Sequence, residues 1–249
     1  MFFLNLFLKF FNLKIIRFLS YENPNLTLVN FKEKKIIKIK FSKFSRALNH
    51  NECAGYKWYN KKNKSKYKIE KFKLFNFYGI KINEFLGEKV NYLNSFSINF
   101  EYISRFIKHY QKIWSKNSIY APAHGDLTFD NIIFSKKGIQ IIDWEFFKKR
   151  GEVKNYDIVY FFLSTIILPN INKRKLLSND LKKAIKLWKK IRPQIRDNYL
   201  KKDPIGFFVD KFANDSHWSK LNFCYSRKFF LNKANKVLLN YLKIIFKNI

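Results

Sequence analysis

The segment from His124 to Glu145, HGDLTFDNIIFSKKGIQIIDWE, places three small polar residues beside runs of apolar residues. Asp126 lies near its start, Asn131 follows five positions later at the beginning of one apolar run, and Asp143 ends a second run. The two runs flank the turn SKKG and predict a β-hairpin, so the three side chains should converge at one end of it. For any one of these residues alone, a turn or cap role is the simpler interpretation.

Two of these side chains would supply the hard oxygen ligands that Mg²⁺ prefers, with water and phosphate oxygens completing the coordination sphere. The remaining carboxylate could then meet a substrate hydroxyl. This combination suits phosphoryl transfer, in which positioning and charge neutralisation carry most of the catalysis. Because His-x-Asp-x-x-x-x-Asn and a hydrophobic-hydrophobic-Asp occur together on one hairpin, chance is a poor explanation.

HGDLTFDN resembles the catalytic loop of the protein-kinase-like fold, whose signature is His-Arg-Asp-x-x-x-x-Asn, and IIDWE falls where that fold carries its Asp-Phe-Gly metal ligand. Gly125 after the His, and Trp-Glu after the second Asp, make the segment more similar to the aminoglycoside phosphotransferase and choline kinase-like group. The resemblance implies that Asp126 is the catalytic base or the residue that orients the acceptor hydroxyl. It also implies that Asn131 and Asp143 bind Mg²⁺.

The same resemblance gives supporting roles to two further residues. His124 would brace the loop rather than transfer protons, and Asp157 in NYDIVYFF would accept hydrogen bonds from the backbone of the catalytic loop. Asp157 can equally be a carboxylate at a helix N-terminus, and the two roles are compatible. Glu145 would be either a third carboxylate near the metal or a surface acid. We prefer the surface acid, because Mg²⁺ usually keeps several waters.

Nucleotide contacts are expected upstream. IIKIKF is similar to the third strand of the family, in which a Lys contacts the nucleotide phosphates. We choose Lys38, while Lys40 points to the same face of the strand and stays an alternative. The helix that follows offers Glu52 as the ion-pair partner of that Lys, with a solvated helix residue as the alternative interpretation.

NEFLGEKV looks like the hinge between the two lobes, where backbone groups of Glu84, Phe85 and Leu86 would hold the adenine ring of ATP. The Gly-rich phosphate loop of protein kinases is missing, because no Gly precedes Gly55. The turn SYENPN would have to cover the phosphates with its backbone N–H groups and its Ser and Asn side chains. Small-molecule members of the fold often lack the glycine pattern, so nucleotide binding is still expected.

Two departures from protein kinases favour a small acceptor. Thr128 stands where Ser/Thr protein kinases place a Lys, and Tyr156 comes only thirteen positions after Asp143, which leaves no room for a long activation segment. The expected acceptor is therefore a hydroxyl of a small molecule or a glycan. The later helical region offers acids and aromatics as candidate acceptor contacts: Asp180, Asp197, Asp203, Asp210, Asp215, Trp188, Phe207, Phe208 and Trp218. The net charge slightly favours an anionic or glycan acceptor, such as a cell-envelope saccharide, over an amine.

Around this centre the patterns predict an α+β fold with two lobes. The order β-β-β-α-β-β is expected first, with strands over 14–19, 26–31, 35–41, 68–78 and 80–86, the last two joined by Gly79, and a helix over 42–60. Helical spacing follows over 96–116 and after Asn155, where one helix should be capped by the Ser-Asn-Asp of 178–180. We expect a small antiparallel β lobe over 1–87 and a larger, mainly helical lobe over 88–249.

The composition, with 47% hydrophobic and 19% aromatic residues, indicates a folded protein. The formal net charge of +32 indicates either attraction to an anionic partner or compositional drift. We prefer drift, because the enriched Lys, Asn, Ile, Phe and Tyr are those favoured by an AT-rich genome. No recognised nucleic-acid-binding motif occurs, which argues against nucleic acid as the main partner.

Two scattered cysteines, Cys53 and Cys224, match no metal-ligand spacing and indicate a reducing, intracellular setting. The N-terminal segment MFFLNLFLKFFNLKIIRFLS is apolar but interrupted by Lys9, Lys14 and Arg17. We expect a helix packed on the domain, with an interfacial helix that contacts a membrane surface as the alternative. The expected location is the cytoplasm, including the inner face of the membrane in that alternative.

These features together predict an ATP- and Mg²⁺-dependent phosphotransferase that acts on a hydroxyl of a small molecule or glycan. Two alternatives stay open: a noncatalytic, nucleotide-binding member of the same fold, and a polyanion-binding protein.

Overall fold

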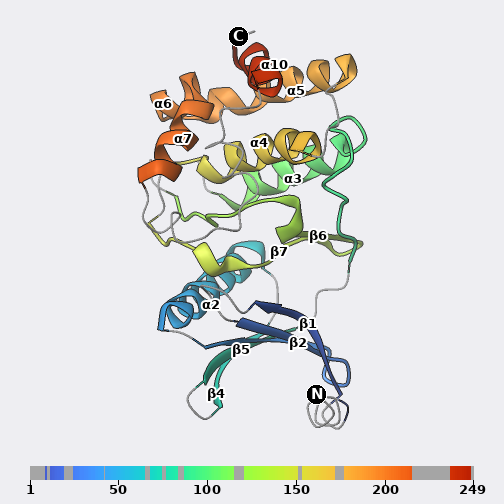
Figure 1. The fold of residues 1–249 in the computed structure, drawn as a ribbon, viewed down its shortest axis with the longest axis vertical. Coiled ribbons are helices and arrows are strands. Elements are labelled where there is room, and N and C mark those ends of the chain that lie inside the picture. The colour runs from blue at the N-terminus through green and yellow to red at the C-terminus, as the bar shows by residue number, and fades with distance from the viewer. Residues whose placement is uncertain are drawn as a thin grey trace. The chain divides into compact units, whose positions relative to one another are not determined.

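The chain forms two compact units in a computed structural model (Figure 1). Unit 1 comprises Met1–Leu86 and Ile142–Lys149, and unit 2 comprises Gly87–Ile141 and Arg150–Ile249. The structure describes residues 9, 12–19, 25–41, 43–64, 68–74, 77–83, 87–114, 121–150, 153–171, 177–214 and 236–247. The assignment of functional lobes to 1–87 and 88–249 stays a prediction.

Unit 1 is built on a five-stranded antiparallel sheet with the strand order β1-β2-β3-β5-β4. Its elements are β1 (Leu13–Leu19), β2 (Asn25–Asn30), β3 (Lys35–Lys40), α2 (Lys43–Asn63), β4 (Ile69–Leu74) and β5 (Phe77–Asn83). The predicted order β-β-β-α-β-β is thus confirmed, and the predicted helix over 42–60 is α2.

The two faces of this sheet differ in chemistry. Leu28, Ile37 and Ile39 are buried on one face, in a cluster that partly buried apolar side chains extend. Because side chains alternate along a strand, Lys38 and Lys40 of β3 point to the opposite face. That face is the one on which α2 packs (Figure 1). The alternation of β3 therefore brings two lysines beneath a helix.

The prediction that two strands are joined at Gly79 is wrong. Gly79 lies inside β5, where it is paired with Ile39 of β3 and Phe72 of β4. A Cβ at this position would overlap the ring of Phe72 and lie 2.9 Å from the carbonyl oxygen of Lys38. The glycine therefore marks a close approach within the sheet, one of the uses of Gly in strands, rather than a connection.

Helix α2 presents a stripe of residues to the segment that follows β7 in the chain. Glu52, Gly55, Tyr56 and Tyr59 are buried at the spacing i, i+3, i+4 and i+7, which places them on one side of the helix. The 3-10 turn η2 (Trp144–Phe146) packs against α2. This packing is the local reason why a segment distant in sequence belongs to unit 1.

Unit 2 is mainly helical, with one β-hairpin. Its principal elements are α3 (Phe100–Ile113), η1 (Phe129–Asn131), β6 (Ile132–Ser135), β7 (Gly138–Ile141), α4 (Tyr156–Ile171), α5 (Ser178–Ile191), η3 (Arg192–Gln194), α6 (Asn198–Lys202), α7 (Pro204–Asn214) and α10 (Lys236–Lys247). Helix α4 is buried on all sides from Tyr156 to Leu168, as expected of a central helix. The predicted hairpin is confirmed, and so is the helical character after Asn155 in the part of that region that the structure describes.

Two helix starts differ from the prediction. The helix expected from residue 96 begins at Phe100, because the backbone N–H groups of Ile98 and Asn99 donate to the carbonyl oxygen of Ser95 in a turn. At the start of α5 the carboxylate of Asp180 accepts from the N–H of Leu177 at 3.1 Å and from the N–H of Ser97 at 2.7 Å. Only the last residue of the expected Ser-Asn-Asp cap therefore satisfies the N-terminal backbone.

The predicted α+β fold class, with a small antiparallel sheet and a larger mainly helical part, is confirmed. Among the described residues, no helix combines the length and the apolar character needed to cross a membrane. Most of the N-terminal segment, the turn 20–24 and the expected adenine contacts Glu84, Phe85 and Leu86 lie outside the described residues. The interpretations given to those segments stay predictions.

Candidate functional site

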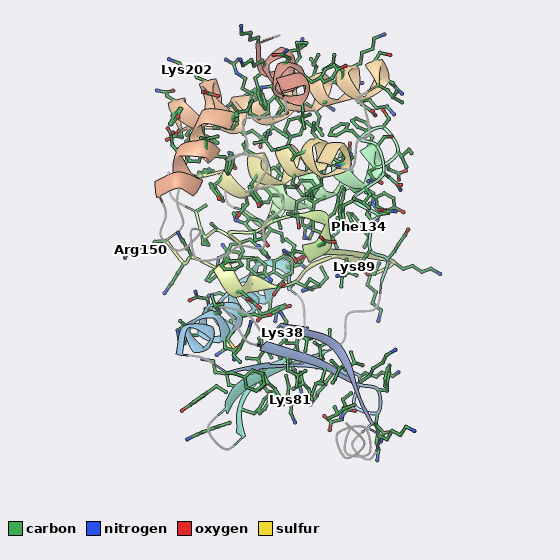
Figure 2. The ribbon with its side chains drawn as sticks, viewed as in Figure 1. Lys38, Lys81, Lys89, Phe134, Arg150 and Lys202 are labelled. Carbon is green, nitrogen blue, oxygen red and sulfur yellow. The ribbon has the colours of Figure 1, made fainter. Side chains whose placement is uncertain are left out.

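Three of the residues singled out in the sequence meet in unit 1. The Nζ of Lys38 lies 2.6 Å from Oε1 of Glu52 and 2.6 Å from Oδ1 of Asp143. Lys38 comes from β3, Glu52 from α2 and Asp143 from the residues directly after β7. Figure 2 labels Lys38 on the part of the sheet that faces α2. The fold thus joins residues that are 14 and 105 positions apart in the chain.

A second ion pair extends this cluster. The Nζ of Lys40 lies 2.6 Å from Oε1 of Glu145, and the same oxygen lies 3.9 Å from the Nζ of Lys38. The side chain of Lys40 is 1% exposed and that of Glu145 is 14% exposed, so the preferred interpretation of Glu145 as a surface acid is wrong. Two lysines buried on one strand face need several carboxylates, because an unpaired buried charge is costly.

Burial and the neighbouring charges shift the pKa values of Lys38 and Glu52. Burial alone would lower the pKa of Lys38, but the carboxylates of Asp143, Glu52 and Glu145 raise that pKa well above its usual range. Burial raises the pKa of Glu52 to about 7, against the opposing effect of Lys38. Lys38 therefore stays a cation at every physiological pH, available to an anionic ligand.

The carboxylates of the cluster fit a hard metal ion. Glu52, Asp143 and Glu145 each offer a carboxylate oxygen, and these oxygens lie within 4.8 Å of one another. Oε2 of Glu52 is buried and has no hydrogen-bond partner. Asp143 is the most accessible of the three, with a side chain that is 33% exposed. Oxygen donors of this kind suit Mg²⁺, and Asp143 is the donor best placed to meet a ligand from solvent.

Asp143 has an unusual backbone conformation, with φ 63° and ψ 56°. This left-handed region costs a residue with a Cβ roughly 1–2 kcal/mol, so the surroundings must hold it. The N–H of Asp143 donates to the hydroxyl oxygen of Tyr56 on α2 at 3.2 Å. Sequence analysis did not identify Tyr56; the available signal was its position four residues after Glu52 on the same helix face.

In unit 2 a loop precedes the hairpin and is fixed by α4. The carboxylate of Asp157 accepts from the N–H of His124 at 2.7 Å and from the N–H of Gly125 at 3.0 Å. Gly125 has φ 90°, a conformation that suits glycine. The fully buried His124 lies with its Nδ1 3.3 Å from the N–H of Asp126. The expected contact between Asp157 and the loop backbone is therefore present.

Burial raises the pKa of Asp157 to about 7, while the two backbone donors act in the opposite direction. The carboxyl group sits at the start of α4, where a negative charge is also favoured by the helix dipole. Asp157 therefore joins the first turn of the central helix to the loop that carries Asp126.

Asp126 itself is only partly buried, whereas Leu127 and Phe129 after it are buried and anchor the loop. The amide Nδ2 of Asn131 donates to the backbone carbonyl of Asp126 at 2.7 Å, so Oδ1 is the atom of this side chain that could bind a metal ion. The hydroxyl of Tyr160 lies 3.4 Å from Oδ1 of Asp126. Tyr160 was not identified from the sequence, although it follows Asp157 by three positions on one face of α4.

The acids proposed to hold an acceptor mostly serve the local structure of unit 2. Asp180 caps α5, Asp197 accepts from the N–H of Leu200 at 2.7 Å, and Asp203 accepts from the N–H of Gly206 at 2.9 Å. Asp210 accepts a hydrogen bond from Tyr199, while Trp188 and Phe208 are fully buried and Phe207 packs on Tyr199. Asp215 and Trp218 lie outside the described residues. The described members of this set therefore have local structural roles, and their contact with an acceptor stays a prediction.

The comparisons with known proteins identify no family for this chain. No protein-family model matches the chain, and no curated protein matches its sequence. Among solved structures, an ethanolamine kinase from Plasmodium vivax is similar, with 13% sequence identity and a TM-score of 0.45 over 94% of this chain and 81% of that chain. At this level of similarity the likeness carries no argument about function, which has to rest on the residues themselves.

Proposed function

We propose that this chain is an ATP- and Mg²⁺-dependent phosphotransferase that transfers the γ-phosphate of ATP to a hydroxyl of a small molecule or glycan. The observation that carries the proposal is the contact of Lys38 with both Glu52 and Asp143 at 2.6 Å. In kinases a Lys–Glu pair holds the nucleotide phosphates beside an Asp that binds the metal. Lys38, Glu52 and Asp143 have the types and the chain order that this arrangement requires.

In the proposed reaction, Asp143 and Asn131 would hold Mg²⁺, which when bound neutralises and orients the phosphate oxygens. Lys38 would contact the phosphates, with Glu52 keeping its ammonium group in place. Backbone groups of Glu84, Phe85 and Leu86 are proposed to hold the adenine ring.

Asp126 would accept the proton of the acceptor hydroxyl, or orient that hydroxyl for attack. Its loop is suited to this role, because its backbone carbonyl accepts from Asn131 and its carboxylate lies within reach of Tyr160. His124 and Asp157 would act only through the loop that they hold. The carboxylate is partly exposed, as a group that meets a diffusible acceptor must be.

The acceptor class follows from what the helical unit offers. Asp180, Asp197 and Asp203 are engaged in helix caps and turns, which makes them less suited to binding an amine. With 50 Lys and Arg residues against 18 Asp and Glu, an anionic small molecule or a glycan is the acceptor class we propose. A cell-envelope saccharide, met at the inner face of a membrane, is within this class.

A metabolite-pool phosphorylation screen with labelled ATP tests activity and acceptor together. The proposal predicts a labelled product with the unaltered chain, a loss of about 10²–10⁴-fold in turnover for Asp126→Ala, and retained stabilisation by ATP and Mg²⁺ in thermal unfolding. Asp130→Ala, which removes an exposed carboxylate from the 3-10 turn that follows Asp126 in the chain, is the matched control and should keep full turnover.

The outcomes separate the candidate functions. Undiminished turnover of Asp126→Ala would remove that residue from the mechanism. Stabilisation by nucleotide without product would favour a noncatalytic nucleotide-binding protein. Salt-sensitive binding of RNA or acidic vesicles without any effect of ATP would favour a polyanion-binding protein.

A further inference from the structure

Helix α2 contains a gap that the indole of Trp144 fills. A Cβ added to Gly55 would lie 2.5 Å from Cβ of Trp144 and 2.8 Å from its Cγ and Cε3. Non-bonded carbon atoms do not come this close to one another. Trp144 can therefore pack against the helix backbone only because position 55 has no side chain. Gly in a helix interior costs about 1 kcal/mol relative to Ala, and this close packing gives it a structural reason.

Aromatic side chains enclose the same indole. Rings of Tyr56, Trp58 and Tyr59 on α2 lie with centroids 6.5, 5.9 and 5.3 Å from that of Trp144, and Phe147 lies 5.8 Å away. Trp144 is fully buried as a result. Since it lies between Asp143 and Glu145 in the chain, its position against α2 fixes the backbone from which both carboxylates extend.

Tyr56, the residue next to Gly55, holds the backbone at Asp143, where the 3-10 turn η2 begins. The hydroxyl of Tyr56 accepts the hydrogen bond from the N–H of Asp143, whose left-handed conformation needs such support. Glu52, one turn earlier on the same face of α2, reaches Lys38 together with Asp143. One face of α2 therefore makes three contacts: with the backbone of Asp143, with the indole of Trp144, and with Lys38, which also contacts the carboxylate of Asp143.

We propose that Gly55 and Tyr56 are positioning residues, which fix the Asp143 turn on α2 so that its carboxylate is oriented to bind the metal of a metal–nucleotide complex. This inference rests on the proposed function, because it assigns Asp143 to that metal. In this proposal α2, which carries Glu52, and the turn at Asp143 are held together by the contacts of Gly55 and Tyr56. Residues that orient a ligand typically affect metal affinity by about 10–100-fold.

The test uses Mn²⁺ and ATP as probes with the full chain. Free Mn²⁺ is measured by electron paramagnetic resonance in titrations of the unaltered protein, Gly55→Ala and Tyr56→Phe, each compared with a titration of ATP alone so that only Mn²⁺ bound to the protein is counted. Both variants should bind Mn²⁺ in the presence of ATP about tenfold or more weakly, with unchanged affinity for ATP in the absence of metal. Near-ultraviolet circular dichroism should also change in Gly55→Ala, because the added methyl group displaces Trp144.

The control is Ala47→Ser, which adds one heavy atom at an exposed position of the same helix. It should match the unaltered protein in every measurement. If Gly55→Ala does not fold, Tyr56→Phe carries the test, because it removes one atom and adds no volume. Raising Mg²⁺ should restore most of the phosphate transfer of Tyr56→Phe, which a general loss of stability would not allow.

The failures of the two proposals are distinguishable. If the unaltered protein binds Mn²⁺ with ATP, and folded Tyr56→Phe and Gly55→Ala bind it equally tightly, the positioning role is wrong and the proposed function stands. If the unaltered protein itself binds no Mn²⁺ in the presence of ATP, the proposed function fails and the positioning role fails with it.

Discussion

Lys38 and Lys40 are two long basic side chains that enter the interior of unit 1 from one face of β3. Each ammonium nitrogen lies 2.6 Å from a carboxylate oxygen, that of Lys38 from Glu52 and Asp143 and that of Lys40 from Glu145. Removing one partner of such a buried pair leaves an uncompensated charge, which is far more costly than the pair itself. The carboxylates are therefore needed for the fold of unit 1 as well as for the proposed chemistry.

Substitution of Lys38 by Met should destabilise the protein by about 3–5 kcal/mol, because Glu52 loses its buried cation. The free energy of unfolding in urea measures this loss. Lys35→Met is the matched control on the same strand: Lys35 is nearer the surface, at 3.6 Å from Glu33 and Glu70, and its loss should cost less than about 1 kcal/mol.

The double variant Lys38→Met/Glu52→Gln separates folding from function. It should be more stable than the sum of the two single losses predicts, since the pair is removed together, while phosphate transfer stays lost. Strictly additive losses would show that Lys38 and Glu52 do not depend on each other in the folded protein.

At the scale of elements, the position of β3 depends on its neighbour β5 and on how closely β4 packs against the other side of β5. Gly79 of β5 leaves the space that the Phe72 ring of β4 occupies. Strand β5 also pairs with β3, where Lys38 lies opposite Ile80 of β5. Crowding at position 79 should therefore disturb both the sheet and the base of the lysine cluster.

Gly79→Ala should lower the free energy of unfolding by about 1–3 kcal/mol, because the added methyl group forces the Phe72 ring or the β3 backbone to move. Chemical denaturation measures this change. Adding Phe72→Val should return part of the loss by removing the ring. A Gly79→Ala protein as stable as the original would mean that the ring and the added methyl group do not meet.

Much of this arrangement could be predicted from the sequence because it follows from local periodicity. The runs that became β1, β2 and β3, helix α2 and the β6–β7 hairpin have the spacing of their elements. Gly79 could not be interpreted in this way, since a glycine that admits a ring and a glycine that makes a turn look alike in sequence. Its role depends on Phe72, which is adjacent only in the folded sheet.

The candidate site shows the same division. Asp126, Asn131 and Asp143 carry a recognisable motif, so their roles could be proposed without a structure and stay predictions. The burial of Glu145 and the contact of Tyr56 with Asp143 could not be predicted, because the partners of both residues come from distant parts of the chain. Such contacts depend on tertiary packing, which residue types and spacing do not encode.

At the scale of the whole molecule, the residues of the proposed site form two sets, each within one compact unit. Asp143 belongs to unit 1, together with Lys38 and Glu52, whereas Asp126 and Asn131 belong to unit 2. Each set is held by its own contacts: α2 holds the first, and α4 holds the second through Asp157. The central claim is that Asn131 and Asp143 bind the same ion.

Titration of Mn²⁺ in the presence of ATP, followed by electron paramagnetic resonance, tests this claim most directly. The account predicts one Mn²⁺ site in the ATP complex, an affinity loss of about tenfold or more for either Asn131→Ala or Asp143→Asn, and a double variant much less affected than the two losses combined. An Asn131→Ala protein that binds Mn²⁺ as tightly as the original, while Asp143→Asn does not, would show that the two residues do not share an ion and would contradict the account.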